Sequence, residues 1–420
     1  MTLPQSLSDW LAYLERIHPS AIDMGLERVS RVRDRLGLAP AFPVITVGGT
    51  NGKGSVCAML EAILSCAGYR VGSYSSPHLL RYNERVRIAR REVDDAVLVD
   101  AFARVEEVRA PDSLTYFEFG TLAAMEIFIR QEVEVAVLEV GLGGRLDAVN
   151  VFDADCTVVT TIDFDHMEYL GPDRESIGRE KAGIFRTGIP AVCGDDDPPE
   201  SLVKRAAEIA APLLLRSRDY GYVAARDDWQ YWSAFGRRAG LPHPALRGSY
   251  QLANAATVLC ALEQSRDKLP VDMGAIRRGL VEVDLPGRFQ VLPGRPMIIL
   301  DVGHNPHAAR GLADSLRALP KGGRVIAVFA MLKDKDIEGV AGALKDEVDE
   351  WMVAALPGTR GADASRIGRA LANVGARGAV AHFDTPADAY RSAIKSAGQD
   401  DKILVFGSFF TVGAAMLARQ

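Results

Sequence analysis

One short segment constrains this chain more than any other: a glycine-rich turn between an apolar run and an amphipathic stretch. Residues 42–47 have the composition of a buried strand, and apolar residues after the turn recur at the spacing of one buried helix face. A strand, a glycine turn and a helix N-terminus direct backbone N–H groups at a phosphate, and a lysine adds positive charge. The sequence therefore predicts a nucleotide-phosphate site formed by Gly49, Thr50, Asn51, Gly52, Lys53, Gly54 and Ser55.

The spacing of this turn departs from the standard phosphate loop. That pattern would place Gly at position 47, where the chain has Val, and Ser or Thr at position 54, where it has Gly. The hydroxyl follows one residue later, at Ser55. The alternative is a glycine-rich turn with no chemical role. The flanking strand and helix favour the phosphate site, because the motif requires that context.

The composition limits the class of protein. A chain of 420 residues can form two or three domains, and 48% hydrophobic with 25% charged residues is typical of a soluble globular protein. A net charge of −6 argues against a general nucleic-acid binder. The five cysteines are scattered, and we find no signal peptide or apolar stretch of membrane-spanning length. We therefore expect a cytoplasmic protein that binds neither nucleic acid nor membranes.

Short apolar runs alternate with helical patterns along the chain. Strands separated by helices imply right-handed crossovers and a mostly parallel sheet. The expected fold is α/β, with an N-terminal P-loop-type ATPase domain and a smaller, Rossmann-like C-terminal domain. The clearest further strands are expected at residues 133–140, 157–162, 297–300, 324–330 and 403–406.

A proline- and glycine-rich stretch predicts the domain boundary. Residues 285–296 contain three prolines and two glycines, which interrupt the pattern of strands and helices. We expect residues 1–290 to form the first domain, 291–296 a linker and 297–420 the second domain. Asp195-Asp196-Asp197-Pro198-Pro199, inside the first domain, is interpreted as an acidic surface turn.

The first strand of the second domain is expected to end beside two polar side chains. Asp301 and His304 follow it directly. Asn305 is a good N-cap and Pro306 a good first helical residue. A helix is therefore expected to start beside a carboxylate and an imidazole.

Polar residues also end the strands of the first domain, where ligands of open parallel sheets collect. Glu139 comes late in residues 133–140, His166 follows residues 157–162, and Ser76 follows Ser75. Their donors could hold a magnesium ion near the nucleotide phosphates. Taken singly, His166 is more typical of a satisfied core histidine, and Glu139 is equally consistent with an internal ion pair. Their joint occurrence with the phosphate loop favours the metal site.

An ordered set of motifs runs through nearly the whole chain. It comprises Gly49-Thr50-Asn51-Gly52-Lys53-Gly54-Ser55, Ser75-Ser76-Pro77-His78-Leu79 with Glu84-Arg85-Val86, Thr115-Tyr116-Phe117-Glu118, Glu139-Val140-Gly141-Leu142-Gly143-Gly144-Arg145-Leu146-Asp147, Asp165-His166, Gly178-Arg179-Glu180-Lys181-Ala182-Gly183-Ile184, Asn254-Ala255-Ala256-Thr257, Pro286-Gly287-Arg288 and Asp301 to Pro306. On these motifs the chain resembles folylpolyglutamate synthases, in particular the bifunctional dihydrofolate synthase/folylpolyglutamate synthases of the Mur ligase superfamily. Gly54 is similar to the folate branch, since peptidoglycan ligases usually carry Thr or Ser there. Gly303 departs from the Ala that relatives often have.

The resemblance implies ATP-dependent ligation of L-glutamate to dihydropteroate, giving dihydrofolate, and to reduced folates, giving folylpolyglutamates. A folate carboxylate attacks the γ-phosphate of ATP, the glutamate amine attacks the acyl phosphate, and ADP and phosphate leave. Such chemistry depends on positioning and on neutralising charge. The resemblance also implies Mg²⁺, as two ions, and a monomer. It leaves open whether a monovalent cation assists.

The resemblance assigns roles residue by residue. Lys53 and His304 are implied as catalytic residues near the phosphates, although His304 could equally orient Asp301. Asn254 is implied as an adenine-side contact, and Arg288 and Asp301 as further nucleotide contacts. The implied magnesium ligands are Ser76, Glu139, His166 and a carbamylated Lys181.

Lys181 is the least obvious of these residues. Taken alone, Arg179-Glu180-Lys181 is typical of a solvated charged turn. In the family the matching lysine is carbamylated. This modification needs a depressed lysine pKa, because carbon dioxide adds to the neutral amine, and its product is negatively charged. We expect Lys181 to be modified and to act in catalysis.

Three segments resemble the dihydropteroate site of the bifunctional enzymes. An aromatic face can stack on a pterin ring, and a carboxylate can pair with its amino-pyrimidine edge. The alternative for Tyr116 and Phe117 is ordinary core packing. Monofunctional polyglutamylating relatives lack a comparable site, so its presence favours two activities. The segments are Ile22-Asp23-Met24-Gly25, Thr115-Tyr116-Phe117-Glu118 and Leu146-Asp147-Ala148.

Three other functions compete with this one. A peptidoglycan amino-acid ligase shares the fold and the chemistry, but Gly54 and the Ser75–Leu79 motif disfavour it. A nucleotide-regulated binding protein would hydrolyse ATP slowly and without glutamate dependence. A simple kinase would release a stable phosphorylated product. We therefore predict a ligase that acts on ATP, L-glutamate, dihydropteroate and reduced folates.

Overall fold

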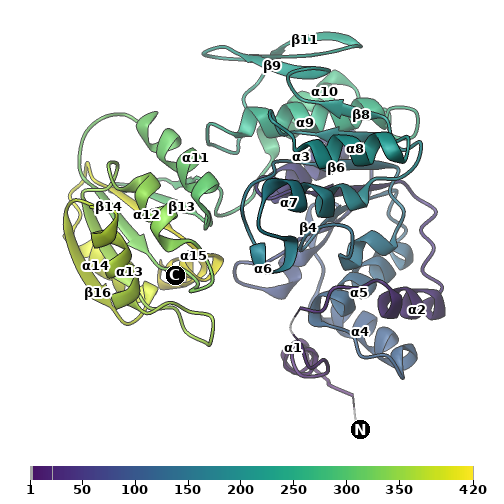
Figure 1. Ribbon diagram of the computed structural model, residues 1–420, viewed down its shortest axis with the longest axis horizontal. Coiled ribbons are helices and arrows are strands. Elements are labelled where there is room, and N and C mark those ends of the chain that lie inside the picture. The colour runs from purple at the N-terminus through teal and green to yellow at the C-terminus, as the bar shows by residue number, and fades with distance from the viewer. Residues whose placement is uncertain (1–2, 21, 420) are drawn as a thin grey trace. The chain divides into compact units, whose positions relative to one another are not determined.

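The computed structural model describes residues 3–20 and 22–419. Contacts divide the chain into two compact units, coloured purple to teal and green to yellow for most of their length (Figure 1). The first unit comprises Met1–Ala245 and Leu252–Val283, and the second comprises Leu246–Gln251 and Asp284–Gln420.

The first unit is built on an eight-stranded sheet in the order β4-β3-β2-β5-β1-β6-β7-β8. Neighbouring strands from β2 to β8 pair in parallel, whereas β3 and β4 form an antiparallel edge. The central strands are buried at every position, as is usual in parallel sheets. The strands are β1 (Val44–Gly48), β2 (Val71–Tyr74), β3 (Val86–Ile88), β4 (Arg91–Glu92), β5 (Val135–Glu139), β6 (Cys156–Val159), β7 (Ala191–Cys193) and β8 (Leu213–Leu215).

Helices with side-chain caps connect these strands. Thr115 and Glu118 form a capping box at the start of α5, and Asp173 accepts from the first turn of α7. The α-helices are α1 (Leu7–Leu14), α2 (Glu27–Leu36), α3 (Lys53–Cys66), α4 (Asp95–Arg109), α5 (Tyr116–Arg130), α6 (Met167–Leu170), α7 (Arg174–Lys181), α8 (Glu200–Glu208), α9 (Gln251–Gln264) and α10 (Met273–Glu282). The 3-10 turns are η1 (Tyr82–Arg85), η2 (Ala148–Val151) and η3 (Ala182–Ile184).

A small antiparallel sheet in the order β11-β10-β9 completes the first unit. Alternation fixes its two faces, because Trp229 and Tyr231 on β10 are buried while their neighbours on the strand are half-buried. The strands are β9 (Tyr220–Ala224), β10 (Trp229–Ser233) and β11 (Gly236–Leu241).

The second unit contains a six-stranded sheet in the order β12-β13-β17-β14-β15-β16. Only the edge strand β12 pairs antiparallel, so the unit is Rossmann-like. Asn305 caps α11, and Pro306 is its first residue, as the sequence predicted. The elements are β12 (Gln290–Leu292), β13 (Met297–Asp301), α11 (Pro306–Arg317), β14 (Val325–Phe329), α12 (Ile337–Leu344), β15 (Glu350–Ala354), α13 (Ala364–Asn373), β16 (Ala379–Phe383), α14 (Pro386–Ser396), β17 (Lys402–Phe406) and α15 (Phe409–Arg419).

The predicted fold class and strands are confirmed. The predicted strand at residues 42–47 corresponds to β1, and the five others correspond to β5, β6, β13, β14 and β17. The largest difference is at β6, which ends at Val159 rather than at residue 162. Beyond Val159 the chain leaves the sheet to contact the phosphate loop, so the apolar pattern continues after strand pairing has ended.

The two units divide at Val283, where the first ends, and at Asp284, where the second resumes. The predicted linker, residues 291–296, overlaps β12, which pairs with β13 of the second sheet. The short segment Leu246–Gln251 also belongs to the second unit, although both of its flanks belong to the first. No local signal in the sequence marked this segment.

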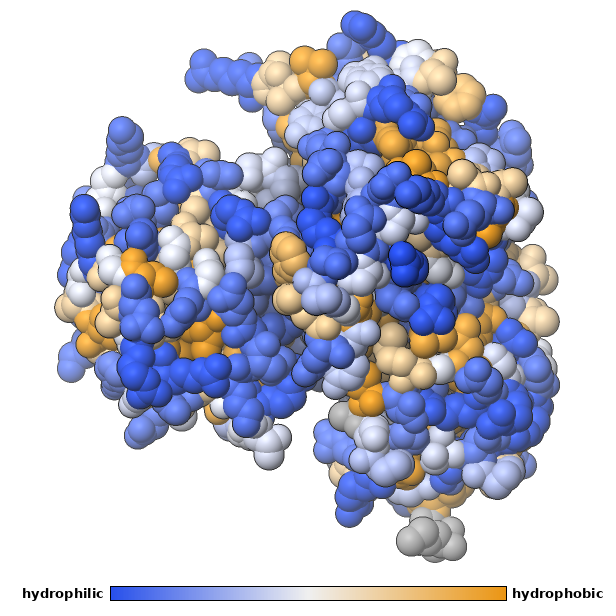
Figure 2. Space-filling view, viewed as in Figure 1, coloured by the Kyte–Doolittle hydropathy of each residue, from blue (hydrophilic) through white to orange (hydrophobic). Residues whose placement is uncertain are grey.

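Hydrophilic side chains cover most of the face seen in Figure 2, and apolar side chains form smaller patches between them. Across residues 3–20 and 22–419, none of the helices combines the length and the apolar character that crossing a membrane requires.

The contact between α3 and α10 provides a test of this packing. Gly279 of α10 lies so close to α3 that a Cβ atom on it would be 2.5 Å from Ile63 Cα. We expect Gly279→Ala to lower the free energy of unfolding by about 1–3 kcal/mol, the usual cost of overpacking. Thermal unfolding followed by circular dichroism measures this loss.

Gly342→Ala is the matched control for Gly279→Ala. It is also a helical glycine, but the nearest atom to an added Cβ, Val374 Cγ1, would be 3.8 Å away. We expect this variant to unfold at the wild-type temperature or slightly above it, because Ala favours helices over Gly. Equal melting temperatures for Gly279→Ala and the wild type would contradict the proposed tight packing.

Candidate active site

The phosphate loop joins β1 to α3. Gly52 adopts a left-handed conformation with φ of 90°, and Lys53 is the first residue of α3. The Lys53 ammonium donates to the carbonyl oxygens of Gly49 at 3.1 Å and Thr50 at 3.3 Å, so its charge lies over the loop. Ser55 is fully buried in the first turn of the helix. The loop thus sits at a helix N-terminus, where backbone N–H groups can receive phosphate.

Two glycines of this loop occupy positions where no side chain fits. A Cβ atom on Gly49 would lie 1.9 Å from Thr160 Oγ1, and one on Gly52 would lie 2.7 Å from Asn254 Oδ1. Both glycines also have positive φ angles, of 134° and 90°. The second contact brings Asn254, the predicted adenine-side residue, against the phosphate loop.

Four neighbouring strands, β2, β5, β1 and β6, end at the same edge of the sheet. Ser76 follows β2, Glu139 ends β5 and His166 follows β6. The Ser76 N–H donates to Glu139 Oε2 at 3.2 Å, which brings these two residues together. The His166 N–H donates to Asp165 Oδ1 at 2.9 Å. The topology therefore aligns the three predicted magnesium ligands with the edge that carries the phosphate loop.

The donors at this edge fit a magnesium ion. Glu139 is 4% exposed, and a buried carboxylate is costly without a compensating charge. Magnesium is usually held by one or two carboxylates together with substrate phosphates and water. Within residues 3–20 and 22–419, no three His, Cys, Asp or Glu side chains are grouped so that they could hold a metal ion. The predicted site therefore depends on Ser76 and Lys181 as well as Glu139 and His166.

Lys181, the last residue of α7, is 3% exposed. The side chain of Lys181 is therefore not solvated, whereas Arg179 of the same segment is exposed. Burial, followed by repulsion from Lys53, lowers the pKa of its amine to about 7, while Asp165 and Asp147 oppose this shift. Close to neutral pH, a large fraction of the amine is therefore uncharged and nucleophilic.

Arg28 connects two of the three segments predicted to bind dihydropteroate. Its guanidinium donates to Asp23 Oδ2 at 2.5 Å and to the Glu118 carboxylate at 2.9 Å. Glu118 also accepts the Thr115 N–H at 2.8 Å, which completes the cap of α5. The loop around Asp23 is thereby tied to the start of that helix.

The third segment is held by the buried Asp147. Its carboxylate accepts the N–H groups of Leu142 at 2.8 Å and Val149 at 3.1 Å, and burial raises its pKa to about 7. The same loop meets both other segments: a Cβ on Gly141 would lie 2.7 Å from the Phe117 ring, and one on Gly143 would lie 3.6 Å from Met24 Cε. The structure thus brings the three predicted segments together.

Arg85 is a candidate functional residue to which the sequence analysis assigned no role. Its guanidinium lies 5.5 Å from the centre of the Tyr116 ring and donates from Nε to His78 Nδ1 at 2.8 Å. Burial and the Arg85 charge lower the pKa of His78 to about 4. Among the described residues, no carboxylate forms an ion pair with Arg85, so this cation is suited to a substrate carboxylate. Only its motif, Glu84-Arg85-Val86, marked it in the sequence.

The second unit gathers its own predicted residues at the end of β13. Asp301 is buried and accepts N–H groups from Phe289 at 2.8 Å and Gly303 at 2.7 Å. Burial raises its pKa, while the positive charge of Arg288 opposes the shift. His304 Nδ1 lies 2.9 Å from the carbonyl oxygen of Val302. Arg288, Asp301 and His304 therefore belong to one small region of this unit.

Comparison with known proteins accounts for both units. The Mur ligase middle domain matches residues 47–262, and the Mur ligase glutamate ligase domain matches residues 287–409. Over 98% of its length the chain is 49% identical to a dihydrofolate synthase/folylpolyglutamate synthase of Escherichia coli K12, of which it covers 94%. The chain belongs to the dihydrofolate synthase/folylpolyglutamate synthase family of Mur ligases. The corresponding protein of Haemophilus influenzae is 43% identical, with 97% of this chain and 96% of that protein covered.

Solved structures of this family match both units. The structure of E. coli FolC in complex with DHPP and ADP is 47% identical to this chain, with a TM-score of 0.95. The match covers 100% of this chain and 99% of the FolC chain. A bifunctional folylpolyglutamate synthase/dihydrofolate synthase with Mn, AMPPNP and L-glutamate bound is 48% identical, with a TM-score of 0.92 and complete coverage of both chains. Family members thus bind adenine nucleotides and a divalent metal.

Glu139→Gln tests the metal site without changing side-chain size. The amide oxygen can still accept the Ser76 N–H, but the negative charge is lost. We expect the half-saturating magnesium concentration for ATP turnover to rise by about tenfold or more, a loss that even an outer-shell partner can cause. A magnesium titration at saturating ATP measures this change.

Glu61→Gln is the control for Glu139→Gln. Glu61 is also a buried carboxylate of this unit, but it pairs with Arg87. We expect its magnesium requirement to remain at the wild-type value. If both variants matched the wild type, Glu139 would have a structural role only.

Proposed function

We propose that this chain is an ATP-dependent ligase that adds L-glutamate to dihydropteroate, giving dihydrofolate, and to reduced folates, giving folylpolyglutamates. The observation that carries this proposal is the convergence of three segments around Asp147 beside the phosphate loop. The positive charge of Lys53 lowers the pKa of both Asp147 and Lys181, which supports the proposal that the two parts form one site. We also propose that the protein acts as a monomer.

The reaction requires three substrates to meet. A pteroate or folate carboxylate attacks the γ-phosphate of ATP, ADP leaves, and the amine of glutamate displaces phosphate from the acyl phosphate. The loop N–H groups and Lys53 hold the phosphates, and their charge stabilises the oxygens that become more negative during transfer. Lys53 and the loop thus contribute mainly position and charge.

Magnesium, when bound, neutralises phosphate charge and fixes the β- and γ-phosphates for attack. Ser76, Glu139, His166 and the modified Lys181 would hold it as two ions. Asn254 lies against Gly52 and contacts the adenine side of the nucleotide. In the second unit, Arg288 and Asp301 contact the nucleotide, and His304 acts as a catalytic residue near the phosphates.

The pterin occupies the site formed by the three segments. Arg28 engages Asp23 and Glu118, and backbone N–H groups engage Asp147, so these carboxylates are oriented before substrate arrives. Tyr116 and Phe117 supply the aromatic surface for the ring. Arg85, beside Tyr116, is suited to the carboxylate of a substrate.

The direct test is product formation. Purified protein with dihydropteroate, L-glutamate and magnesium-ATP is expected to form dihydrofolate, and with a reduced folate it is expected to form a product longer by one glutamate. Lys53→Ala should retain the fold and reduce both rates by on the order of a hundredfold or more, since it removes a preorganised charge at the phosphates. Mass spectrometry detects both products.

Two outcomes would contradict the proposal. Phosphate release that does not depend on glutamate would indicate an ATPase or a regulated binding protein. A wild-type protein that extends folates but is inert toward dihydropteroate would be a polyglutamylating enzyme only.

Carbamylation of Lys181 should depend on pH. With a pKa near 7, the amine is about one-tenth neutral at pH 6 and about nine-tenths neutral at pH 8. Since only the neutral amine adds carbon dioxide, we expect carbamate formation to rise over this interval. Carbon-13 NMR of the metal-free protein in labelled bicarbonate measures the carbamate signal.

Lys181→Gln is the control for this experiment. It removes the amine and should abolish the carbamate signal and the ligase activity together. A wild-type protein without the signal at pH 8, or a variant that retains it, would contradict the modification of Lys181.

A further inference from the structure

The turn after β7 lies outside the site described so far. The expectation that Asp195-Asp196-Asp197 forms an acidic surface turn is wrong for Asp195, which is 8% exposed. Burial raises the pKa of its carboxyl, and N–H donors from Ile162 and Asp197 oppose the shift. One acidic residue of the three is therefore turned inward, and the structure shows what it contacts.

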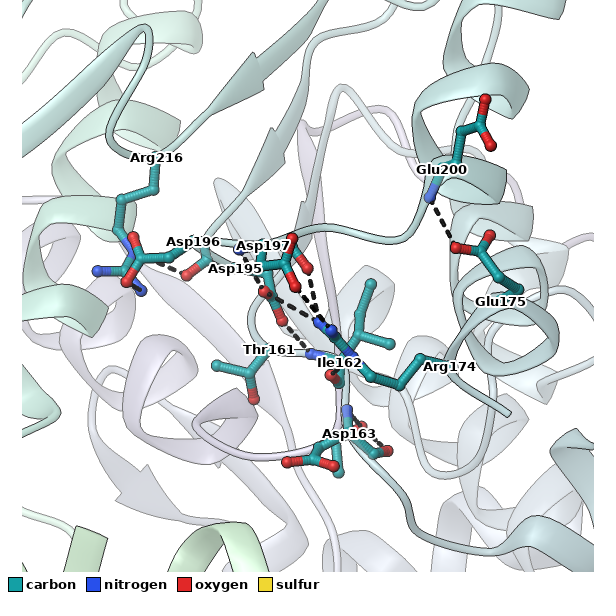
Figure 3. Close-up of polar contacts among 12 residues, drawn as sticks. Thr161, Ile162, Asp163, Arg174, Glu175, Asp195, Asp196, Asp197, Glu200 and Arg216 are labelled. Atoms are coloured by element: carbon teal, nitrogen blue, oxygen red, sulfur yellow. Dashed lines mark hydrogen bonds and ion pairs between the residues drawn. The ribbon is translucent and has the colours of Figure 1, made fainter. Parts of the chain in front are cut away.

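Ile162 is held through its backbone from two directions (Figure 3). Its N–H donates to Asp195 Oδ2 at 2.6 Å, and its carbonyl oxygen accepts from Arg174 Nε at 3.0 Å. Ile162 is itself buried, so its backbone groups would otherwise lack water as a partner. A carboxylate and a guanidinium thus fix both backbone polar groups of one residue after β6.

Arg174 and Asp195 also belong to one network. Arg174 donates to the Asp197 carbonyl oxygen at 2.6 Å and to Asp197 Oδ2 at 3.0 Å, and it lies 3.4 Å from Asp195 Oδ1. The Asp197 N–H donates to Asp195 Oδ1 at 2.9 Å. Both carboxylate oxygens of Asp195 therefore accept hydrogen bonds within this network, as Figure 3 shows.

The residues on either side of Ile162 contact the phosphate loop. The carbonyl oxygen of Thr161 accepts the Thr50 N–H at 2.6 Å, and its hydroxyl accepts the Asn51 N–H at 3.2 Å. The Asp163 N–H donates to Thr50 Oγ1 at 3.1 Å. The loop that Asp195 and Arg174 hold on one side thus holds the phosphate loop on the other.

We propose that Asp195 and Arg174 are positioning residues for the phosphate loop, acting through the backbone of Ile162. The proposal rests on the proposed nucleotide site. Arg174 begins α7 and Lys181 ends it, so the same network also links the phosphate loop to the helix of the buried lysine. Loss of either residue releases Ile162, and the loop then receives magnesium-nucleotide in a poorer geometry.

The test uses two variants that keep side-chain size close to the original. In Asp195→Asn, the amide nitrogen faces one of the two N–H donors, so one buried donor loses its acceptor. In Arg174→Met, the side chain has no N–H donor, so the contact with Ile162 and the charge are both lost. Arg174→Lys restores the charge without the planar fork and serves as the conservative variant.

Asp196→Asn is the matched control. Asp196 lies in the same turn, but its carboxylate pairs with Arg216 at 2.7 Å and accepts from Ser217 Oγ at 2.7 Å, away from Ile162. This variant removes one negative charge and one ion pair from the turn and leaves the contacts of Ile162 unchanged.

Two readouts separate positioning from stability. Calorimetric titration with ADP and magnesium measures nucleotide affinity without any ligation, and steady-state kinetics measures KM for ATP and kcat separately. We expect Asp195→Asn and Arg174→Met to weaken ADP binding and raise KM for ATP by about tenfold, with a smaller change in kcat. Arg174→Lys should fall between Arg174→Met and the wild type, and Asp196→Asn should match the wild type.

A merely structural role would lower the folded fraction, which reduces kcat and the number of binding sites but leaves the affinity of the folded molecules unchanged. Wild-type ADP affinity in Asp195→Asn and Arg174→Met would therefore overturn the proposal, as would an equal loss in Asp196→Asn. If the wild type binds ADP but forms no dihydrofolate, the proposed function fails while the positioning role is still measured.

Discussion

The hydrogen bonds between the phosphate loop and residues 161–163 are the constraint on which the rest of the site depends. They join the ends of β1 and β6, and the closeness of Gly49 to Thr160 leaves no room for these ends to shift. A parallel sheet fixes the height at which each strand stops, but it does not orient the chain beyond that point. The hydrogen bonds between the phosphate loop and residues 161–163 set this orientation. They therefore fix the position of Lys53 relative to the segment that contains His166.

Charge is the second organising factor. Lys53 and Lys181 influence each other in a poorly hydrated region that also contains Asp147 and Asp165. Two ammonium groups there would repel each other, and this repulsion adds to the effect of burial in lowering the pKa of Lys181. Backbone N–H groups stabilise the Asp147 carboxylate directly, and the positive charge of Lys53 also lowers its pKa.

Features formed by neighbouring residues could be predicted from the sequence, whereas features that depend on contacts between distant residues could not. The phosphate loop was predicted because strand, glycines, lysine and helix are contiguous. The burial of Asp195 was not, because it depends on Arg174 and on Ile162, which is 33 positions away. The clamp of Arg28 on Glu118 joins residues 90 positions apart and was missed for the same reason. Lys181 was identified only through a family resemblance, since its burial depends on tertiary packing around an otherwise polar helix end.

The segment Leu246–Gln251 sets a limit on where this chain can be cut. A fragment beginning at Asp284 would contain the whole six-stranded sheet but would lack Tyr250, which packs on Gly311 and whose hydroxyl lies 3.5 Å from Asp301. It would also lack the Ser249 N–H that donates to Ser315 Oγ. During synthesis, this segment leaves the ribosome before the unit that it completes. The second unit is therefore continuous in space but not along the chain. Leu246–Gln251 must wait for residues 284–420 to be synthesised before it can pack against them.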